Sequence, residues 1–189
     1  MLRVEPITKD FSDLALVCEL NKSQFPKNER TPIWLALRMA KTKKGVVDFL
    51  AFYDDVQFVG FVYLFTLNGL TSVMLLAVNS AIQSKGYGRQ ILEHVKSLYS
   101  DNRITINIED FDERAKNIEQ RKRRKAFYIR NGYESAGFSV KLFSNGFEVL
   151  ISCGHSISVD EILAMYKTIF GAFVFYILKP FVRIGKTTI

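Results

Sequence analysis

Residues 78–89 limit what this chain of 189 residues can fold into more than any other part of its sequence. An apolar run at residues 73–78 precedes the stretch and predicts a buried strand. Apolar residues recur at helical spacing over residues 91–99, which predicts a helix after it. Two glycines, Gly86 and Gly88, lie between these elements. The sequence therefore predicts a strand, a short glycine-bearing loop and the start of a helix.

A loop of this kind at the start of a helix can bind phosphate. The first N–H groups of a helix lack partners within the helix and point along the positive end of its dipole. Gly86 and Gly88 carry no side chains, so an anion can approach the backbone closely. The loop is too short for a Walker A motif, and the three-glycine dinucleotide fingerprint is absent.

The loop resembles the first signature of the GNAT superfamily, the acetyl-CoA-dependent N-acetyltransferases. That signature is glutamine or arginine, two residues, glycine, one residue, then glycine or alanine, and Gln83, Gly86 and Gly88 match it. A second signature, tyrosine followed by three residues, glycine and an aromatic, resembles Tyr128 to Tyr133. The resemblance covers roughly residues 2–152, and an ordinary strand-to-helix turn is the alternative.

Length and a hydrophobic content of 48% fit one domain with a full core. Asn68-Gly69 is the strongest short hairpin signal. The predicted strands are residues 2–7, 46–53, 56–67, 73–78, 104–109, 138–143 and 147–152. The predicted helices are residues 11–20, 33–39, 91–99 and 119–130. The resemblance implies an α/β (α+β) fold, the GNAT acyl-CoA N-acyltransferase fold, with a mixed, mostly antiparallel sheet flanked by helices.

The resemblance also implies where acetyl-CoA binds. In GNAT proteins a backbone N–H at a bulge in the strand before the loop stabilises the acyl oxygen, and the matching position is near Leu76. Backbone N–H groups at Leu76 and Val78 are expected to face the acyl-pantetheine, and the loop to hold the pyrophosphate. The expected acetyl-CoA-binding residues are Leu76, Val78, Gln83, Ser84, Lys85, Gly86, Tyr87, Gly88, Arg89 and Tyr128.

Acetyl transfer from a thioester needs a donor for the oxyanion and a proton for the departing thiolate. The resemblance implies the backbone of Leu76 as that donor and Tyr128 as the acid. A tyrosine hydroxyl can donate without ionising near neutral pH. The alternative for Tyr128 is a core aromatic that packs beside Phe127.

The incoming amine must also lose a proton, and the base for that step stays open. Some GNAT enzymes carry a glutamate in the strand before the loop, but residues 72–77 contain no acid. Glu109, at the end of the next predicted strand, is the expected substitute, and Glu29 is another. Either carboxylate can instead be a solvated charge, and a water chain can take the proton.

The resemblance thus implies an enzyme, a GNAT-type N-acetyltransferase that moves an acetyl group from acetyl-CoA to a primary amine. The acceptor is a small molecule or a peptide that the sequence does not identify. A non-catalytic acyl-CoA-binding or scaffolding module on the same fold is the alternative. The missing acid in residues 72–77 favours this alternative, whereas the intact loop and Tyr128 favour the enzyme.

Charge and cysteine content limit the partners. A net charge of +7 and a pI of about 9.4 suit an anionic ligand such as coenzyme A, but equally an acidic surface or nucleic acid. Two cysteines and two isolated histidines form no metal-ligand pattern, so no metal is expected. The first residues lack the apolar core of a signal peptide, and a cytoplasmic protein with reduced thiols is expected.

Residues 121–125 are a basic run within a predicted helix. Such a run is usually a solvated helical face. Pairing with the 3′-phosphate of coenzyme A and binding of nucleic acid are the alternatives. The run has no interleaved aromatics and no recognised nucleic-acid motif, so nucleic acid is not an expected partner.

Residues 162–178 are almost wholly apolar, and Lys179-Pro180 ends the run. The expected organisation is a GNAT N-acetyltransferase domain at residues 1–155 and a C-terminal apolar helical extension at residues 156–189, packed on the domain or on a partner. Because a helix apolar on all sides must be buried on more than one side, a homodimer is expected. Contact with a membrane surface is the less favoured alternative, since the run is borderline for the ~20 residues of a spanning helix.

Overall fold

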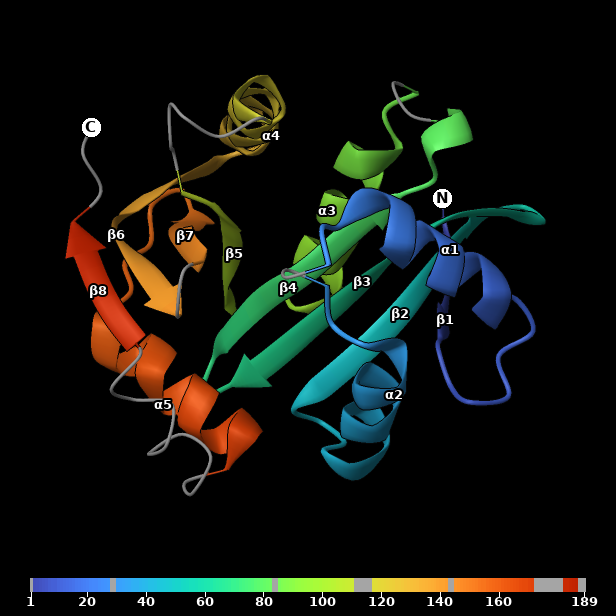
Figure 1. Cartoon of the computed structure of the whole chain (residues 1–189), viewed down its shortest axis with the longest axis horizontal. Helices are drawn as coiled ribbons and strands as arrows, with labels where there is room; N and C mark the ends of the chain where they lie inside the picture. The colour runs from blue at the N-terminus through green and yellow to red at the C-terminus, as the bar shows by residue number, and fades with distance from the viewer. Residues whose placement is uncertain are drawn as a thin grey trace. The chain divides into compact units, whose positions relative to one another are not determined.

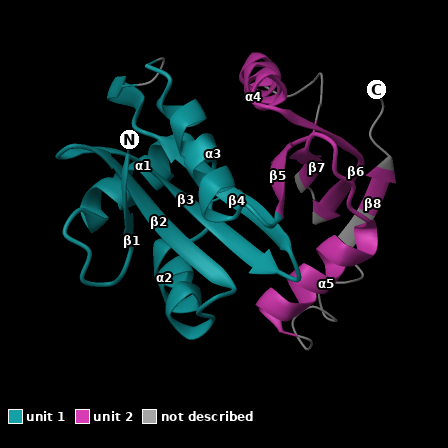
Figure 2. Ribbon diagram, turned by 180° about the vertical axis from the view of Figure 1, so that it is seen from behind, with its two compact units in different colours: residues 1–102 teal, residues 103–189 magenta. Residues whose placement is uncertain are grey.

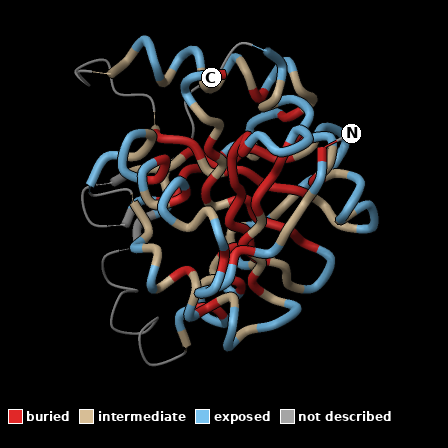
Figure 3. The backbone as a smooth tube through the Cα atoms, turned by 90° about the vertical axis from the view of Figure 1, so that its right-hand side faces the viewer, coloured by how far each residue is buried: buried red, intermediate tan, exposed pale blue. Residues whose placement is uncertain are grey.

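The computed structural model describes residues 2–27, 30–82, 85–110, 117–142, 145–171 and 182–186. The chain divides into two compact units, Met1–Asn102 and Arg103–Ile189, each with its own strands and helices (Figure 1, Figure 2). Buried stretches lie mainly in the strands (Figure 3). The sheet of each unit therefore carries most of that unit's core.

The described part of the first unit contains a four-stranded antiparallel meander, in which each strand pairs with the next. Its strands are β1 (Arg3–Pro6), β2 (Val47–Asp54), β3 (Gln57–Leu67) and β4 (Leu70–Val78). Asn68 and Gly69, which join β3 to β4, have φ values of 49° and 72°. Positive φ at both residues is what a tight two-residue hairpin requires, so the predicted Asn-Gly hairpin is confirmed.

Helices cover both faces of this meander. They are α1 (Leu14–Gln24), α2 (Ile33–Thr42) and α3 (Tyr87–Leu98). α1 and α2 lie on one face, and α3 lies on the other (Figure 1, Figure 2). On the α2 face, the Tyr63 hydroxyl lies 3.5 Å from the Met39 sulfur. On the α3 face, the ring of His94 packs edge-on against Phe52, with ring centroids 5.9 Å apart.

Two tyrosines hydrogen bond the ends of α3 to the ends of β2. Tyr87, the first residue of α3, donates to Oδ2 of Asp54 at 2.6 Å. Tyr99, which caps the C-terminus of α3, donates to Oδ2 of Asp48 at 2.8 Å. Asp48 and Asp54 are an even number of residues apart on one strand, so they point to the same face. α3 therefore runs along β2 and is attached to it at both ends.

The described part of the second unit has a sheet in the order β5-β7-β6-β8, with antiparallel neighbours. Its strands are β5 (Arg103–Glu109), β6 (Tyr133–Leu142), β7 (Asn145–Ser152) and β8 (Val182–Lys186). Its helices are α4 (Ile118–Arg130) and α5 (Val159–Phe170). The predicted fold class, α/β with a mostly antiparallel sheet flanked by helices, is confirmed.

α5 is the helical part of the predicted C-terminal extension. Ser158 begins it with a capping box: its hydroxyl accepts from the N–H of Glu161, and the Glu161 carboxylate accepts from the N–H of Ser158. The buried residues of α5 are Ile162, Met165 and Ile169. β8, which pairs with β6, was not predicted. Residues 172–181, which include the end of the apolar run, lie outside the described residues.

α5 and β8 belong to the same unit as β5, β6 and β7. The predicted boundary between residues 155 and 156 stays a prediction. None of the described helices has both the length and the apolar character needed to cross a membrane.

The ion pair between Arg103 and Glu161 predicts a pH-dependent stability. Arg103 donates to Glu161 at 2.6 Å, and this bond, with the backbone N–H of Ser158, lowers the pKa of the Glu161 carboxyl to about 2. A depressed pKa contributes stability above the unfolded value, 4.5, and that stability is lost as the pH falls through the folded value. Because the side chain is 40% exposed, we expect Glu161→Gln to lower the free energy of unfolding by about 1 kcal/mol or less at pH 7.

Urea unfolding at pH 7 and at pH 3 measures this effect. The difference between Glu161→Gln and the unchanged chain should shrink as the pH falls from 4.5 toward 2. Glu19→Gln, at an exposed position on α1, is the control and should change stability little at either pH. A loss that is the same at both pH values would show that the Glu161 carboxylate does not act through its charge.

Candidate active site

β4, the strand before the glycine loop, contains a bulge. Tyr63 of β3 lies opposite Leu75. The next residue of β3, Leu64, lies opposite Val73, so Met74 is the additional residue in β4. A bulge in this strand was expected, and it lies two residues before the predicted position.

Beyond the bulge, the backbone of β4 has a defined orientation. Val78 lies opposite Gly60, and the N–H of the next residue, Asn79, donates to the carbonyl oxygen of Val59 at 2.8 Å. Bonding to a neighbour alternates along an antiparallel strand. The N–H groups of Val78 and Leu76 therefore point away from β3, which is the orientation that the predicted contacts with an acyl group require.

Gly60 brings β3 and β4 unusually close at this end. A Cβ at Gly60 would lie 2.1 Å from the carbonyl oxygen of Ala77, a distance that no side chain tolerates. Only glycine fits this position without moving β4. Gly60 was not predicted, because no residue near it in the sequence indicates a close approach to another strand.

The loop after β4 ends in a left-handed residue at the start of α3. Gly86 has φ 81° and ψ 1° and is the residue that precedes α3. The carbonyl oxygen of Gly86 accepts from the N–H of Gln90 at 3.1 Å, the first bond of the helix. The N–H groups of Tyr87, Gly88 and Arg89 therefore lie before the helical ladder begins and are available to an anion. Of the predicted loop residues, Gln83 and Ser84 lie outside the described residues.

Charge and hydrogen bonds at this helix start suit an anionic ligand. The first turn of α3 contains no acidic residue. Arg89 is exposed and forms an ion pair with Glu93, one turn along, at 2.7 Å. The bond from Tyr87 to Asp54 raises the pKa of the tyrosine and attaches the first turn to β2. Leu76, Val78 and the described loop residues, 85–89, therefore all belong to the first unit.

Tyr128 lies in the second unit, on α4, and is 6% exposed. Its ring packs edge-on against Phe127 and Tyr133, at centroid distances of 5.1 and 6.2 Å. Burial raises the pKa of Tyr128 to about 12, so the hydroxyl keeps its proton at any ordinary pH. These contacts fit both a proton donor and a core aromatic, and the catalytic role stays a prediction.

Glu109, the expected base, is also in the second unit and is 6% exposed. Its Oε2 accepts a hydrogen bond from Nη1 of Arg124 on α4. Glu109 is thus a buried carboxylate with a cationic partner, and not a solvated charge. Glu29, the other substitute, lies outside the described residues.

The basic run of α4 is largely engaged within its own unit. Arg124 pairs with Glu109, as described above. Lys125 forms an ion pair with Glu148 of β7 at 2.8 Å, and Glu148 is 2% exposed. Arg121 donates to the carbonyl oxygen of Asp110 at 2.7 Å. A solvated face, the most favoured prediction for the run, therefore describes only part of it. Both acids are visible in the sequence, but only the ion pairs of Glu109 with Arg124 and of Glu148 with Lys125 show that they reach α4.

Metal-ligand clusters of three or more His, Cys, Asp or Glu are absent from the described parts of both units. The two cysteines, Cys18 and Cys153, are free thiols.

Residues 46–135 match the family model of the acetyltransferase (GNAT) domain. This segment contains β2, β3, β4, the glycine loop, α3, β5 and α4, which carry all the predicted site residues. The resemblance found in the sequence is confirmed: the chain contains a segment that matches the acetyltransferase domain of the GNAT family.

Solved structures share this fold. A GNAT-family protein from Bacteroides thetaiotaomicron is 21% identical, with a TM-score of 0.66, and the match covers 90% of this chain and 98% of that one. An aminoglycoside 6'-N-acetyltransferase in complex with coenzyme A is 15% identical, with a TM-score of 0.59 and coverage of 79% and 96%. The ribosomal-protein-S18-alanine N-acetyltransferase of Escherichia coli is 13% identical, with a TM-score of 0.59 and coverage of 84% and 96%. A comparison with curated protein sequences finds no match.

Proposed function

We propose that this chain transfers an acetyl group from acetyl-CoA to a primary amine of a small molecule or peptide. The observation that carries the proposal is the start of α3. There Gly86, in the left-handed conformation, leaves three backbone N–H groups available at the end of the loop that follows β4. The family match supports an acyl-CoA as donor, and one similar structure contains coenzyme A.

Each predicted residue has a defined part in the reaction. The amine nitrogen attacks the carbonyl carbon of the thioester, and the N–H of Leu76 stabilises the charge that develops on the carbonyl oxygen. The C–S bond then breaks, and Tyr128 gives its proton to the sulfur. Val78 and the loop residues bind the remainder of the coenzyme A. The residues present fit this co-substrate, because a helix start without acidic side chains takes the pyrophosphate.

The amine loses its proton to Glu109 or, through water, to solvent. Arg124 occupies Oε2 of Glu109, so the proposal assigns the proton to Oε1. The same contact supports the water route, since Arg124 already takes one of the two oxygens of Glu109. No metal ion has a part in these steps.

The acceptor class is supported by what similar structures act on. One is an aminoglycoside 6'-N-acetyltransferase, and another acetylates the alanine of a ribosomal protein. An amine of a small molecule and an amine of a peptide are therefore both within the range of this fold. The acceptor itself is the open part of the proposal.

Release of free thiol from acetyl-CoA tests the proposal. The full chain is incubated with polyamines, aminoglycosides, amino acids and peptides with free N-termini, and each acceptor is also tested without protein. We expect thiol release that depends on both the protein and one class of amine. Failure to bind acetyl-CoA at all would contradict the proposal.

A non-catalytic acyl-CoA-binding or scaffolding module is the second candidate. The bond between Glu109 and Arg124 favours it, as does the lack of any acidic residue in β4. Calorimetry separates the two: acetyl-CoA binding without thiol release across the amine panel identifies the module.

We also propose that the protein is a homodimer, as the apolar residues 162–178 predict, and that it is cytoplasmic. Light scattering of the full chain should show one species of twice the 21.7 kDa chain mass. A monodisperse monomer would rule out the dimer, and co-sedimentation with lipid vesicles would favour contact with a membrane surface.

A further inference from the structure

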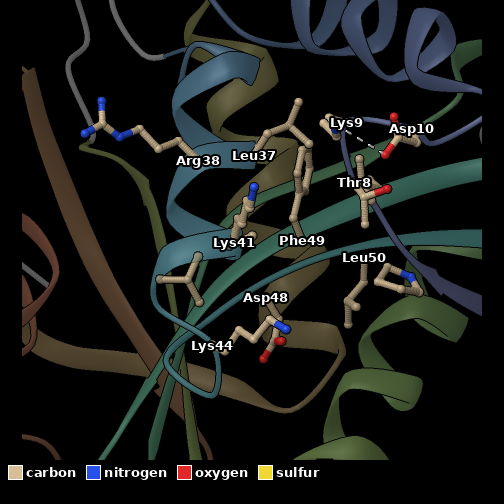
Figure 4. A pocket seen from close by; sticks show the side chains of 14 residues that line it. Thr8, Lys9, Asp10, Leu37, Arg38, Lys41, Lys44, Asp48, Phe49 and Leu50 are labelled. Atoms are coloured by element: carbon tan, nitrogen blue, oxygen red, sulfur yellow. Dashed lines mark ion pairs between the residues drawn. The ribbon is translucent and has the colours of Figure 1, made fainter.

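The first unit contains a cavity at the edge of its sheet, where β1 ends and β2 continues. β1 pairs with β2 only as far as Pro6, which lies opposite Leu50. One more bond follows, from the N–H of Ile7 to the carbonyl oxygen of Phe49 at 2.7 Å. Beyond it, the segment after β1, the end of α2 and the start of β2 enclose about 710 Å³ (Figure 4).

The interior of this cavity is apolar. Ile7, Val47 and Phe49 are at most 3% exposed, and Leu37, Ala40 and Leu50 are further apolar residues of the lining. A volume of this size, lined mainly by aliphatic and aromatic side chains, is within the range of small-molecule binding sites. The body of a ligand for this cavity is therefore apolar.

The rim of the cavity carries an excess of positive charge. Four cations line it, against two carboxylates, Asp10 and Asp48. The nearest oxygen of Asp10 lies 4.0 Å from Lys9, and Asp48 accepts from Tyr99. Each carboxylate therefore already has a neighbouring group, Lys9 for Asp10 and the Tyr99 hydroxyl for Asp48.

The other three cations are Arg38, Lys41 and Lys44 (Figure 4). Within the described ranges, none of their side chains has an ion-pair or hydrogen-bond partner. All three are exposed and come from α2 and the turn after it. A ligand that enters the cavity therefore meets Lys41 and Lys44, while Arg38 extends away from the cavity and adds positive charge to the same helix (Figure 4).

The cavity is separate from the acyl-CoA loop. Its lining comes from the segment after β1, from α2 and from β2, and none of it from β4 or from residues 85–89. β3 lies between β2 and β4 in the meander. The cavity is therefore a second site in the first unit.

We propose that this cavity binds an amphipathic anion, with an apolar body inside and a carboxylate or phosphate head against Lys41 and Lys44, and with Arg38 adding to the positive charge of the rim. Charge complementarity fixes the sign of the head, since hydrogen bonds to charged groups are the stronger ones. The volume and apolar lining fix the character of the body. This inference does not depend on the acetyl-transfer proposal.

Calorimetry of the full chain with four ten-carbon probes tests the proposal. Decanoate and decyl phosphate carry the two anionic heads, decanol is neutral, and decylamine is cationic. We expect one or both anions to bind about tenfold or more tightly than decanol, and decylamine not to bind. Binding of decanoate alone identifies a carboxylate head, and binding of decyl phosphate alone a phosphate head. Equal binding of decanol, or no binding of either anion, would overturn the proposal.

Variants locate the bound anion. A triple variant, Arg38→Gln with Lys41→Gln and Lys44→Gln, should lower the affinity about tenfold or more. The matched control neutralises three exposed cations elsewhere, Lys22, Lys27 and Arg130, and should change the affinity less than about twofold. Equal losses in the two triple variants would mean a general charge effect and would overturn the site.

A cavity-filling variant tests the apolar body separately. Ala40 lines the cavity from α2, and Ala40→Phe should fill part of it and weaken binding of the anions while leaving the three cations in place. Unchanged affinity in a folded Ala40→Phe protein, checked by circular dichroism, would place the apolar body elsewhere. If this variant does not fold, the two triple variants still decide the proposal.

Discussion

Gly86→Asp is expected to lower the affinity for acetyl-CoA by about a hundredfold or more. Gly86 has φ 81°, a conformation that costs a residue with a side chain about 1–2 kcal/mol. A carboxylate here also faces the pyrophosphate with like charge at the positive end of α3. A Cβ at Gly86 meets nothing within 4 Å, so the substitution should leave the packing of the first unit intact.

Gly69→Asp is the matched control for this effect. Gly69 has φ 72°, a Cβ there also meets nothing within 4 Å, and the residue lies in the turn between β3 and β4. Both variants therefore introduce similar backbone strain and the same charge, but only one of them does so at the loop. Calorimetry with acetyl-CoA should separate them. Equal affinities of the two variants, in proteins with native circular dichroism, would contradict the binding of the pyrophosphate at the start of α3.

Tyr128→Phe is expected to lower kcat by about ten- to a thousandfold, the range for loss of one positioned acid. Acetyl-CoA affinity should hardly change, because the ring remains and only the hydroxyl is removed. Burial raises the pKa of Tyr128 to about 12. Loss of the Tyr128 hydroxyl proton should therefore reduce kcat only when the pH is above about 11. Steady-state kinetics with the best acceptor of the amine panel, over a range of pH, measures both quantities.

Tyr133→Phe controls for the loss of a hydroxyl from this aromatic cluster. Tyr133 is 1% exposed and packs edge-on against Tyr128. If both variants lose the same activity and the same stability, the cluster acts through packing. If Tyr128→Phe retains full turnover, Tyr128 is a core aromatic and another group protonates the thiolate.

The features that the sequence predicts well are local ones. The Asn68-Gly69 turn and the left-handed Gly86 depend on the φ preference of one or two residues, which the sequence states directly. The same holds for α3, whose apolar spacing is visible within the helix itself. These local features were enough to identify the loop, and through it the family.

The features that were missed depend on residues far apart in the chain. Arg124 and Lys125 look like a solvated run until the fold places Glu109 of β5 and Glu148 of β7 within ion-pair distance of them. Gly60 is required only because the Ala77 carbonyl lies against it. β8 gains its hydrogen bonds from β6, 40 or more residues earlier, so its own short sequence gives little signal.

The attachment of α3 to β2 has a consequence for how the first unit responds to ligands. From Tyr87 to Tyr99 the helix rises about 18 Å, and from Asp48 to Asp54 the strand extends about 20 Å, so the two pairs of contacts match in length. One attachment lies at the acyl-CoA loop, and the other, Asp48, lines the cavity. If an anion in the cavity displaces Tyr99 from Asp48, α3 keeps only one of its two hydrogen bonds to β2, the one from Tyr87 to Asp54 at the loop. Any change in acetyl-CoA affinity that results must then be matched, factor for factor, by acetyl-CoA's effect on that anion.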